Sequence, residues 1–143
     1  MDLKENTNQV FQQVTKAIQE TGREDGSVSV IAVTKYVDIA TAANLIDQGV
    51  KHIGENRVDK FLEKYHALSD KDVTWHLIGS LQRRKVKDVI PFVDYFHALD
   101  SLKLAQEIQK RADRTVKCFL QVNISGEESK HGFSKEELLT VLP

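Results

Sequence analysis

Two periodicities of hydrophobic and polar residues alternate along this chain. The first segment, Asn8–Glu20, repeats its apolar residues with a period near 3.6, which predicts an amphipathic helix. Its apolar stripe consists of Val10, Phe11, Val14 and Ile18. Thr21 and Gly22 come next and predict the end of this helix.

Beyond this helix, short runs of β-branched and aromatic residues alternate with segments of helical period. The runs predict strands at Ser27–Thr34, Lys51–Gly54, Val73–Gly79, Asp94–Leu99 and Val116–Ile124. They begin near residues 28, 51, 73, 94 and 116, at intervals of 21 to 23 residues. Each interval leaves room for a crossover helix and two tight loops. We therefore expect right-handed βαβ units and a parallel sheet.

Residues that start and stop helices lie where this alternation requires them. Asp38 and Asp100 are predicted N-caps, and Gly49 stands where a helix C-terminal glycine belongs. Pro91 is expected to stop the fourth helix. Ser134, followed by Glu137, resembles a capping box and predicts a last short helix.

Two α/β architectures fit five such units within one domain that spans residues 1–143. A five-stranded doubly wound sheet is complete at this length. A parallel (β/α) barrel needs about eight units, so the chain would supply only its N-terminal portion, about five units plus the first helix. The last residues, 140–143, follow a predicted helix with no closing element, which favours the incomplete barrel.

Composition narrows the classes of function. The chain is 41% hydrophobic and 29% charged with a net charge of −1, which favours neither nucleic acid nor a membrane surface as a partner. The basic run at 83–87 contains no aromatic residue that could stack on bases, which argues against RNA. Being close to a helix start it could bind phosphate, although a solvated helix face is the more frequent role of such a run. Cys118 is the only cysteine and no apolar stretch is long enough to span a membrane, so we expect a cytoplasmic protein.

Polar residues gather at the predicted strand ends, where parallel βα proteins place their sites. The first strand leads into Lys35, the second into Asn56, the third into Gly79 and the fifth into Asn123. An apolar strand end would remove water from the Lys35 amine and favour the neutral form that condenses with aldehydes. A lysine at a strand end also commonly points into solvent, and position alone leaves both interpretations open.

Other candidates have simpler structural interpretations. His76 alternates with Trp75 and Leu77, and a core or rim histidine is the more frequent role at such a position. Because no further histidine or cysteine stands at metal-ligand spacing, we predict no metal site. Cys118 is expected to be a small core residue. A glycine-rich nucleotide fingerprint and a P-loop are both absent from the sequence.

Several motifs in order along nearly the whole chain carry a resemblance to a known family. The motifs are Ala32-Val33-Thr34-Lys35, Gly54-Glu55-Asn56, Trp75-His76-Leu77-Ile78-Gly79-Ser80-Leu81-Gln82, Gln121-Val122-Asn123-Ile124 and Ser129-Lys130-His131-Gly132. The sequence resembles the pyridoxal phosphate homeostasis proteins, relatives of the alanine racemase N-terminal barrel. It departs from the common pattern at Tyr36 and Arg84, outside the motif cores.

The resemblance implies a pyridoxal 5′-phosphate (PLP) site with a role for each candidate. Lys35 would hold PLP as a Schiff base, and Asn56 would lie near the cofactor ring. His76 and Gly79 would line the same mouth, and Asn123 would belong to the same rim. The phosphate-binding loops of the family lie beyond the stretch that this sequence matches, so we expect weaker PLP affinity than in longer relatives.

Three functions remain open at this point. The first, favoured by the resemblance, is a protein of intracellular PLP homeostasis that carries the cofactor to PLP-dependent apoenzymes and turns over no substrate. The second is a PLP-dependent amino-acid racemase or decarboxylase, which needs a positioned second base. The third is a flavodoxin-like phospho-ligand domain. An unclosed barrel also leaves bare sheet edges, which predicts a homo-oligomer.

Overall fold

Five parallel strands form one sheet in the computed structural model, which describes residues 2–127 and 131–142. The strands are β1 (Ile31–Val33), β2 (His52–Glu55), β3 (Thr74–Leu77), β4 (Tyr95–Leu99) and β5 (Lys117–Leu120). The helices are α1 (Leu3–Glu20), α2 (Ile39–Asp47), α3 (Val58–Leu68), α4 (Val86–Val89), α5 (Leu102–Arg111) and α6 (Lys135–Val141). Short 3₁₀ helices at Arg83–Lys85 and Ile90–Phe92 flank α4.

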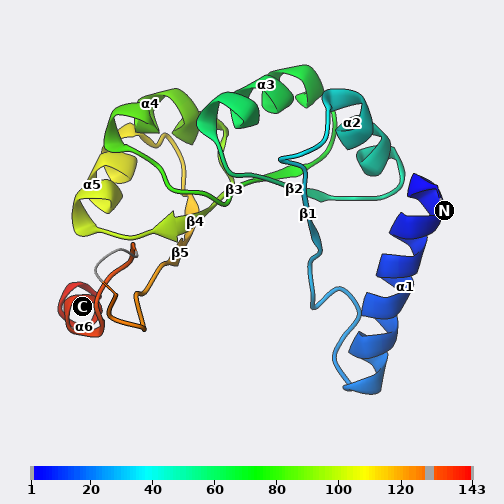
Figure 1. Cartoon of the computed structure of the whole chain (residues 1–143), viewed down its shortest axis with the longest axis horizontal. Helices are drawn as coiled ribbons and strands as arrows, with labels where there is room; N and C mark the ends of the chain where they lie inside the picture. Colours follow the sequence, from blue (N-terminus) through cyan, green and yellow to red (C-terminus); the bar gives the residue numbers. More distant parts are fainter. Residues whose placement is uncertain (1, 128–130, 143) are drawn as a thin grey trace.

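The strand order decides between the two expected architectures. The order is β1-β2-β3-β4-β5, and each strand pairs in parallel with the next in sequence. A doubly wound sheet reverses direction at a switch point and puts helices on both faces. Here α2, α3, α4 and α5 form an arc over one face, as Figure 1 shows. The fold is therefore a partial (β/α) barrel, and the doubly wound alternative was wrong.

The hydrophobic core lies between the sheet and this arc of helices. Trp75 on β3 packs against α3, with its ring centroid 5.7 Å from that of Phe61 and 5.4 Å from that of Tyr65. Phe61, Leu77 and Phe96 are fully buried in the same cluster. Successive residues of a strand face opposite sides of the sheet. The strand residues that alternate with these core residues, such as His76 between Trp75 and Leu77, therefore point to the other face. We call this second face, which the four helices leave uncovered, the open face.

Most predicted strands are shorter in the structure than in the sequence pattern. The first was expected at Ser27–Thr34 but spans Ile31–Val33, because its partner β2 begins at His52, opposite Ile31. Residues 27–30 therefore have no neighbouring strand to pair with. The fifth was expected to reach Ile124 but ends at Leu120, which pairs with the last residue of β4. Cross-strand partners, which a sequence pattern does not contain, set these limits.

The predicted helix caps were mostly confirmed. Asp38 caps α2 by accepting from the Thr41 amide, and Gly49 follows that helix with φ of 105°. Asp100 was wrong: Ser101, in extended conformation, caps α5 instead. Because α5 begins at Leu102, Ser101 is the residue that flanks its first turn, and the Ser101 hydroxyl reaches the Leu104 amide; Asp100 lies one residue too early.

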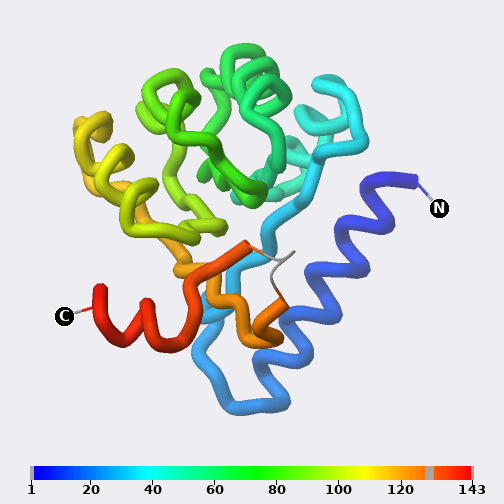
Figure 2. Tube along the Cα trace, turned by 60° about the vertical axis from the view of Figure 1, so that its left-hand side comes forward, coloured from blue at the N-terminus to red at the C-terminus, as the bar shows by residue number. Residues whose placement is uncertain are grey.

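Further differences concern the fourth helix and the two ends of the chain. Helix α4 ends at Val89, and Pro91 lies inside the following 3₁₀ helix. Helix α1 begins at Leu3, earlier than expected, because the Asp2 carboxylate accepts from the Glu5 amide and caps it. Figure 2 shows α1 and α6 at opposite sides of the molecule. Within the described residues, no helix combines the length and apolar character needed to cross a membrane.

Candidate functional site

The carboxyl ends of β1, β2 and β3 meet at one edge of the sheet. Val33 pairs with Gly54, which in turn pairs with His76. Beyond the strands the pairing continues, with the Thr34 amide donating to the Gly54 carbonyl at 3.0 Å. The backbone register therefore brings the residues that follow these strands to a common rim.

Lys35 lies at this rim, directly after Thr34. Its side chain is exposed, and its Nζ lies 5.1 Å from the ring centroid of Tyr36. The expectation that an apolar strand end removes water from this amine was wrong, because Tyr36 is itself 90% exposed and gives little shelter. A cavity of about 520 Å³ adjoins Lys35, between the β1–α2 turn and α3. Its wall includes Lys60, Glu63 and Lys64 of α3.

Asn56 and Gly79 lie in direct backbone contact at the same edge. A Cβ atom on Gly79 would collide with the carbonyl oxygen of Asn56, so only glycine allows this approach. Asn56 lines a separate cavity of about 330 Å³ together with Ser80, Gln82 and Lys85. The structure thus brings Asn56 and Gly79 together, whereas Lys35 faces a different cavity.

His76 lies within β3 on the open face and bonds to two other histidines. Its Nε2 is 3.0 Å from Nδ1 of His52, and its Nδ1 is 2.8 Å from Nε2 of His97. Tyr95 stacks on it at a centroid distance of 4.7 Å, so that His76 is only 3% exposed. Sequence reasoning missed this chain of imidazoles. The signal was a histidine in each of three consecutive predicted strands.

The imidazole chain favours uncharged rings. Burial first, and then the neighbouring rings of His97 and His52, lower the pKa of His76 to about 4, whereas Asp94 acts in the opposite direction. Burial also lowers the pKa of His97. Neutral imidazoles each offer one donor and one acceptor, which a hydrogen-bonded chain requires. Within residues 2–127 and 131–142, no group of three or more ligand side chains is arranged to hold a metal ion.

A buried ionic network lies directly behind the rim. The Nζ atom of Lys64 on α3 lies 2.8 Å from Oε2 of Glu55 and donates to the backbone carbonyl of Thr34 at 2.5 Å. The Thr34 hydroxyl donates to the same carboxylate oxygen. Sequence reasoning named Glu55 only as part of the Gly54-Glu55-Asn56 motif, and it missed Lys64 because a lysine within an amphipathic helix usually faces solvent.

Asn123 lies in the loop that follows β5 and holds the shape of that loop. Its amide nitrogen donates to the Glu127 carbonyl at 2.7 Å, and its Oδ1 accepts from the Ser125 hydroxyl at 3.0 Å. Its backbone amide donates to the Phe133 carbonyl at 2.8 Å. The motif residues Ser129 and Lys130 lie outside the described residues.

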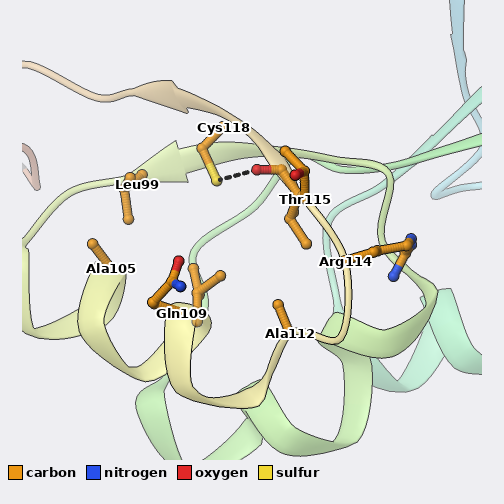
Figure 3. Close-up of a pocket in the computed structure, with 9 residues that line it drawn as sticks. Leu99, Ala105, Gln109, Ala112, Arg114, Thr115 and Cys118 are labelled. Carbon is orange, nitrogen blue, oxygen red and sulfur yellow. Dashed lines mark hydrogen bonds between the residues drawn. The ribbon is translucent and has the colours of Figure 1, made fainter.

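A cavity of about 510 Å³ between α5 and β5 contains none of the predicted site residues. Figure 3 shows Cys118 at its wall, with Sγ directed toward the Val116 carbonyl at 3.7 Å. Cys118 is half-buried, and this burial raises the pKa of its thiol. The thiol is therefore a weak nucleophile, in line with its predicted role as a core residue.

Comparison with known proteins decides the family. The sequence profile described as "Alanine racemase, N-terminal domain" matches residues 6–143. The chain belongs to the alanine racemase N-terminal domain family. Among curated relatives of this family member, the pyridoxal phosphate homeostasis protein of Aquifex aeolicus (strain VF5) is 38% identical over 96% of the chain and 62% of its own length. The namesake from Pseudomonas aeruginosa (strain PAO1) is 32% identical over 94% and 60%.

Solved structures of relatives have the same fold as this chain. PipY of Synechococcus elongatus PCC7942, solved with PLP bound, superposes with a TM-score of 0.76 at 32% identity, covering 90% of this chain and 61% of PipY. A protein of unknown function from Bifidobacterium adolescentis gives 0.78 at 35% identity, covering 92% and 58%. The chain thus spans about three fifths of the length of these relatives.

Proposed function

We propose that this chain binds PLP, that Lys35 holds the cofactor as a Schiff base, and that its role is PLP homeostasis. The observation that carries the proposal is the exposed amine of Lys35 at the carboxyl edge of the sheet, beside a cavity of about 520 Å³. An accessible primary amine fits an aldehyde ligand: nitrogen adds to the carbonyl carbon and one water leaves. The PLP-bound PipY structure supports this choice of ligand.

Roles for the remaining rim residues form part of the proposal. Asn56 would orient a ring substituent of the cofactor, and Gly79 allows the Asn56 backbone to take its place at the rim. His76 would line the mouth of the site from the open face, where its hydrogen bonds to His52 and His97 hold its ring in place. Asn123 would contribute by holding the loop after β5 against Phe133.

The proposed protein is a carrier rather than an enzyme, with PLP-dependent apoenzymes as recipients and the cytoplasm as its setting. The homeostasis names of the relatives support this choice. A racemase would need, in addition to Lys35, a second base positioned to exchange a proton with the substrate.

Borohydride trapping tests the Lys35 assignment. The chain is incubated with PLP, reduced and digested, and the labelled peptide is identified by mass spectrometry. We expect label on Lys35 and its loss in Lys35→Ala, whereas Lys60→Ala, a lysine of the same cavity, keeps it. Label spread over several exposed lysines, unchanged in Lys35→Ala, would contradict the assignment. Racemisation of alanine that depends on Lys35 would contradict the carrier role.

We also propose that copies of this chain associate through the open face and the sheet edges. The exposed apolar side chains Val33, at 51%, and Phe119, at 54%, lie on the two edge strands and support this proposal. Unpaired edge strands present free backbone donors and acceptors to a second copy.

A further inference from the structure

The buried network behind Lys35 joins three elements at one point. Glu55 ends β2, Thr34 follows β1, and Lys64 lies on α3. The Lys64 ammonium contacts both the Glu55 carboxylate, at 2.8 Å, and the Thr34 carbonyl, at 2.5 Å. Glu55 is fully buried and Lys64 is 4% exposed. One cation therefore fixes the peptide group that connects Thr34 to Lys35.

Stability alone explains this arrangement poorly. Taking two charges out of water costs free energy that their attraction only partly returns, so buried pairs commonly stabilise less than an apolar replacement. Among the described residues, the second carboxylate oxygen of Glu55, Oε1, is buried and accepts no hydrogen bond, which adds a further cost. A feature that is expensive for folding is expected to serve another purpose.

The position of the network suggests that purpose. Lys35 is the residue immediately after the anchored carbonyl, and Asn56 is the residue immediately after Glu55. The Glu55 carbonyl also accepts from the Ile78 amide at 2.8 Å, one residue before Gly79. Holding Glu55 and Thr34 in place thus fixes the backbone next to the three rim residues Lys35, Asn56 and Gly79. The Lys35 side chain, by contrast, is exposed, with its Nζ atom 5.1 Å from the centroid of the exposed Tyr36 ring.

We propose that the Glu55–Lys64 ion pair is a positioning device that fixes the backbone of Lys35 so that its amine meets the aldehyde of PLP. This inference rests on the proposed function of Lys35. Neither Glu55 nor Lys64 is a catalytic residue here, because both act through the Thr34–Lys35 peptide. Fixed geometry matters because small misplacements of a reacting group slow its reaction strongly.

The decisive variant is Glu55→Met/Lys64→Met, which replaces both charges with apolar side chains of similar length. Removing one charge alone leaves the other buried and unpaired, whereas removing both is often neutral for stability. The matched control is Lys103→Met, the same exchange at an exposed lysine of α5, away from the cavity. Glu55→Gln/Lys64→Gln, which removes both charges but keeps amide donors and acceptors, serves if the double methionine variant does not fold.

Two measurements decide the inference. In the double variant we expect the initial rate of borohydride-trapped label on Lys35 to fall about tenfold while the melting temperature stays near that of the parent. We also expect faster amide hydrogen exchange in a peptide that covers Thr34 and Lys35. Lys103→Met should change neither. A double variant with parental stability and parental trapping rate would overturn the inference.

The same experiment separates this inference from the proposed function. If the parent carries no label on Lys35, the proposed function fails, and the exchange measurement still decides whether the ion pair anchors the rim. If exchange at Thr34 and Lys35 is the same in the parent, the control and the double variant, the anchoring is refuted whatever the label shows.

Discussion

The Nδ1 atom of His76 lies 2.8 Å from Nε2 of His97, across the pairing of β3 with β4. Because burial and the adjacent rings lower the pKa of His76 to about 4 from an ordinary value of 6.5, the folded protein keeps this ring neutral. The unfolded chain takes up a proton there as the pH falls through 6.5, and the folded protein does so only near 4.

This difference predicts a loss of stability in acid. The contribution of His76 is fully present above pH 6.5 and declines as the pH falls toward 4, by up to about 3 kcal/mol. Urea unfolding at several pH values measures it, and His76→Gln should have a flatter profile. His66→Gln, an exchange at an exposed histidine of α3, should keep the parental slope. Equal slopes in the parent and His76→Gln would refute the prediction.

Contact between Gly79 and Asn56 predicts a sensitive position. The added methyl of Gly79→Ala would collide with the Asn56 backbone, which is not free to move as a side chain would be. We expect a loss of about 1 to 3 kcal/mol in the free energy of unfolding, measured by urea denaturation. Ser80→Ala, at the exposed next residue, should stay within about 0.5 kcal/mol of the parent. Unchanged stability of Gly79→Ala would contradict the prediction and mean that the Asn56 and Gly79 backbones can move apart.

The cap of α5 distinguishes two neighbouring residues. The Ser101 hydroxyl accepts from the Leu104 amide at 3.1 Å, so Ser101→Ala should cost about 1 kcal/mol. Asp100→Asn, which alters the residue expected from sequence to be the cap, should change stability by less than about 0.5 kcal/mol. Thermal unfolding compares the two variants. The reverse ranking would place the cap at Asp100 after all.

Self-association through the open face predicts a change in mass. Phe119→Lys puts a charge on the exposed edge strand β5 and should shift the sedimentation coefficient toward the single chain. Leu102→Lys, at a comparably exposed apolar residue of α5, is the control and should leave the parental distribution unchanged. If both variants sediment like the parent, the contact between copies lies elsewhere.

The alternation of elements could be predicted from the sequence because each element buries a face with its own period. Ser134 and Asp38 were predicted as caps correctly, since a cap depends on residues within one turn. The sequential strand order was not determined by pattern, since a doubly wound sheet has the same alternation of strands and helices. It became visible only through pairs such as Val33 with Gly54.

The site was less predictable than the fold because its contacts join distant residues. Thr34, Glu55 and Lys64 are separated by loops and meet only through the packing of α3 on the sheet. The rim location of Lys35 followed from its place after a strand, whereas the exposure of its side chain was visible only in the structure. Contacts of this kind depend on the register between neighbouring strands and on helix packing, and the sequence of one segment does not specify either.

The unbroken strand order β1 to β5 has a consequence for how the protein forms. Each strand pairs with the strand that precedes it in the sequence, so no strand of the sheet requires a distant partner. Such short-range contacts shorten the search for native pairing and permit assembly to follow synthesis. While the sheet is incomplete, its last strand is an unpaired edge that is open to pairing with another chain.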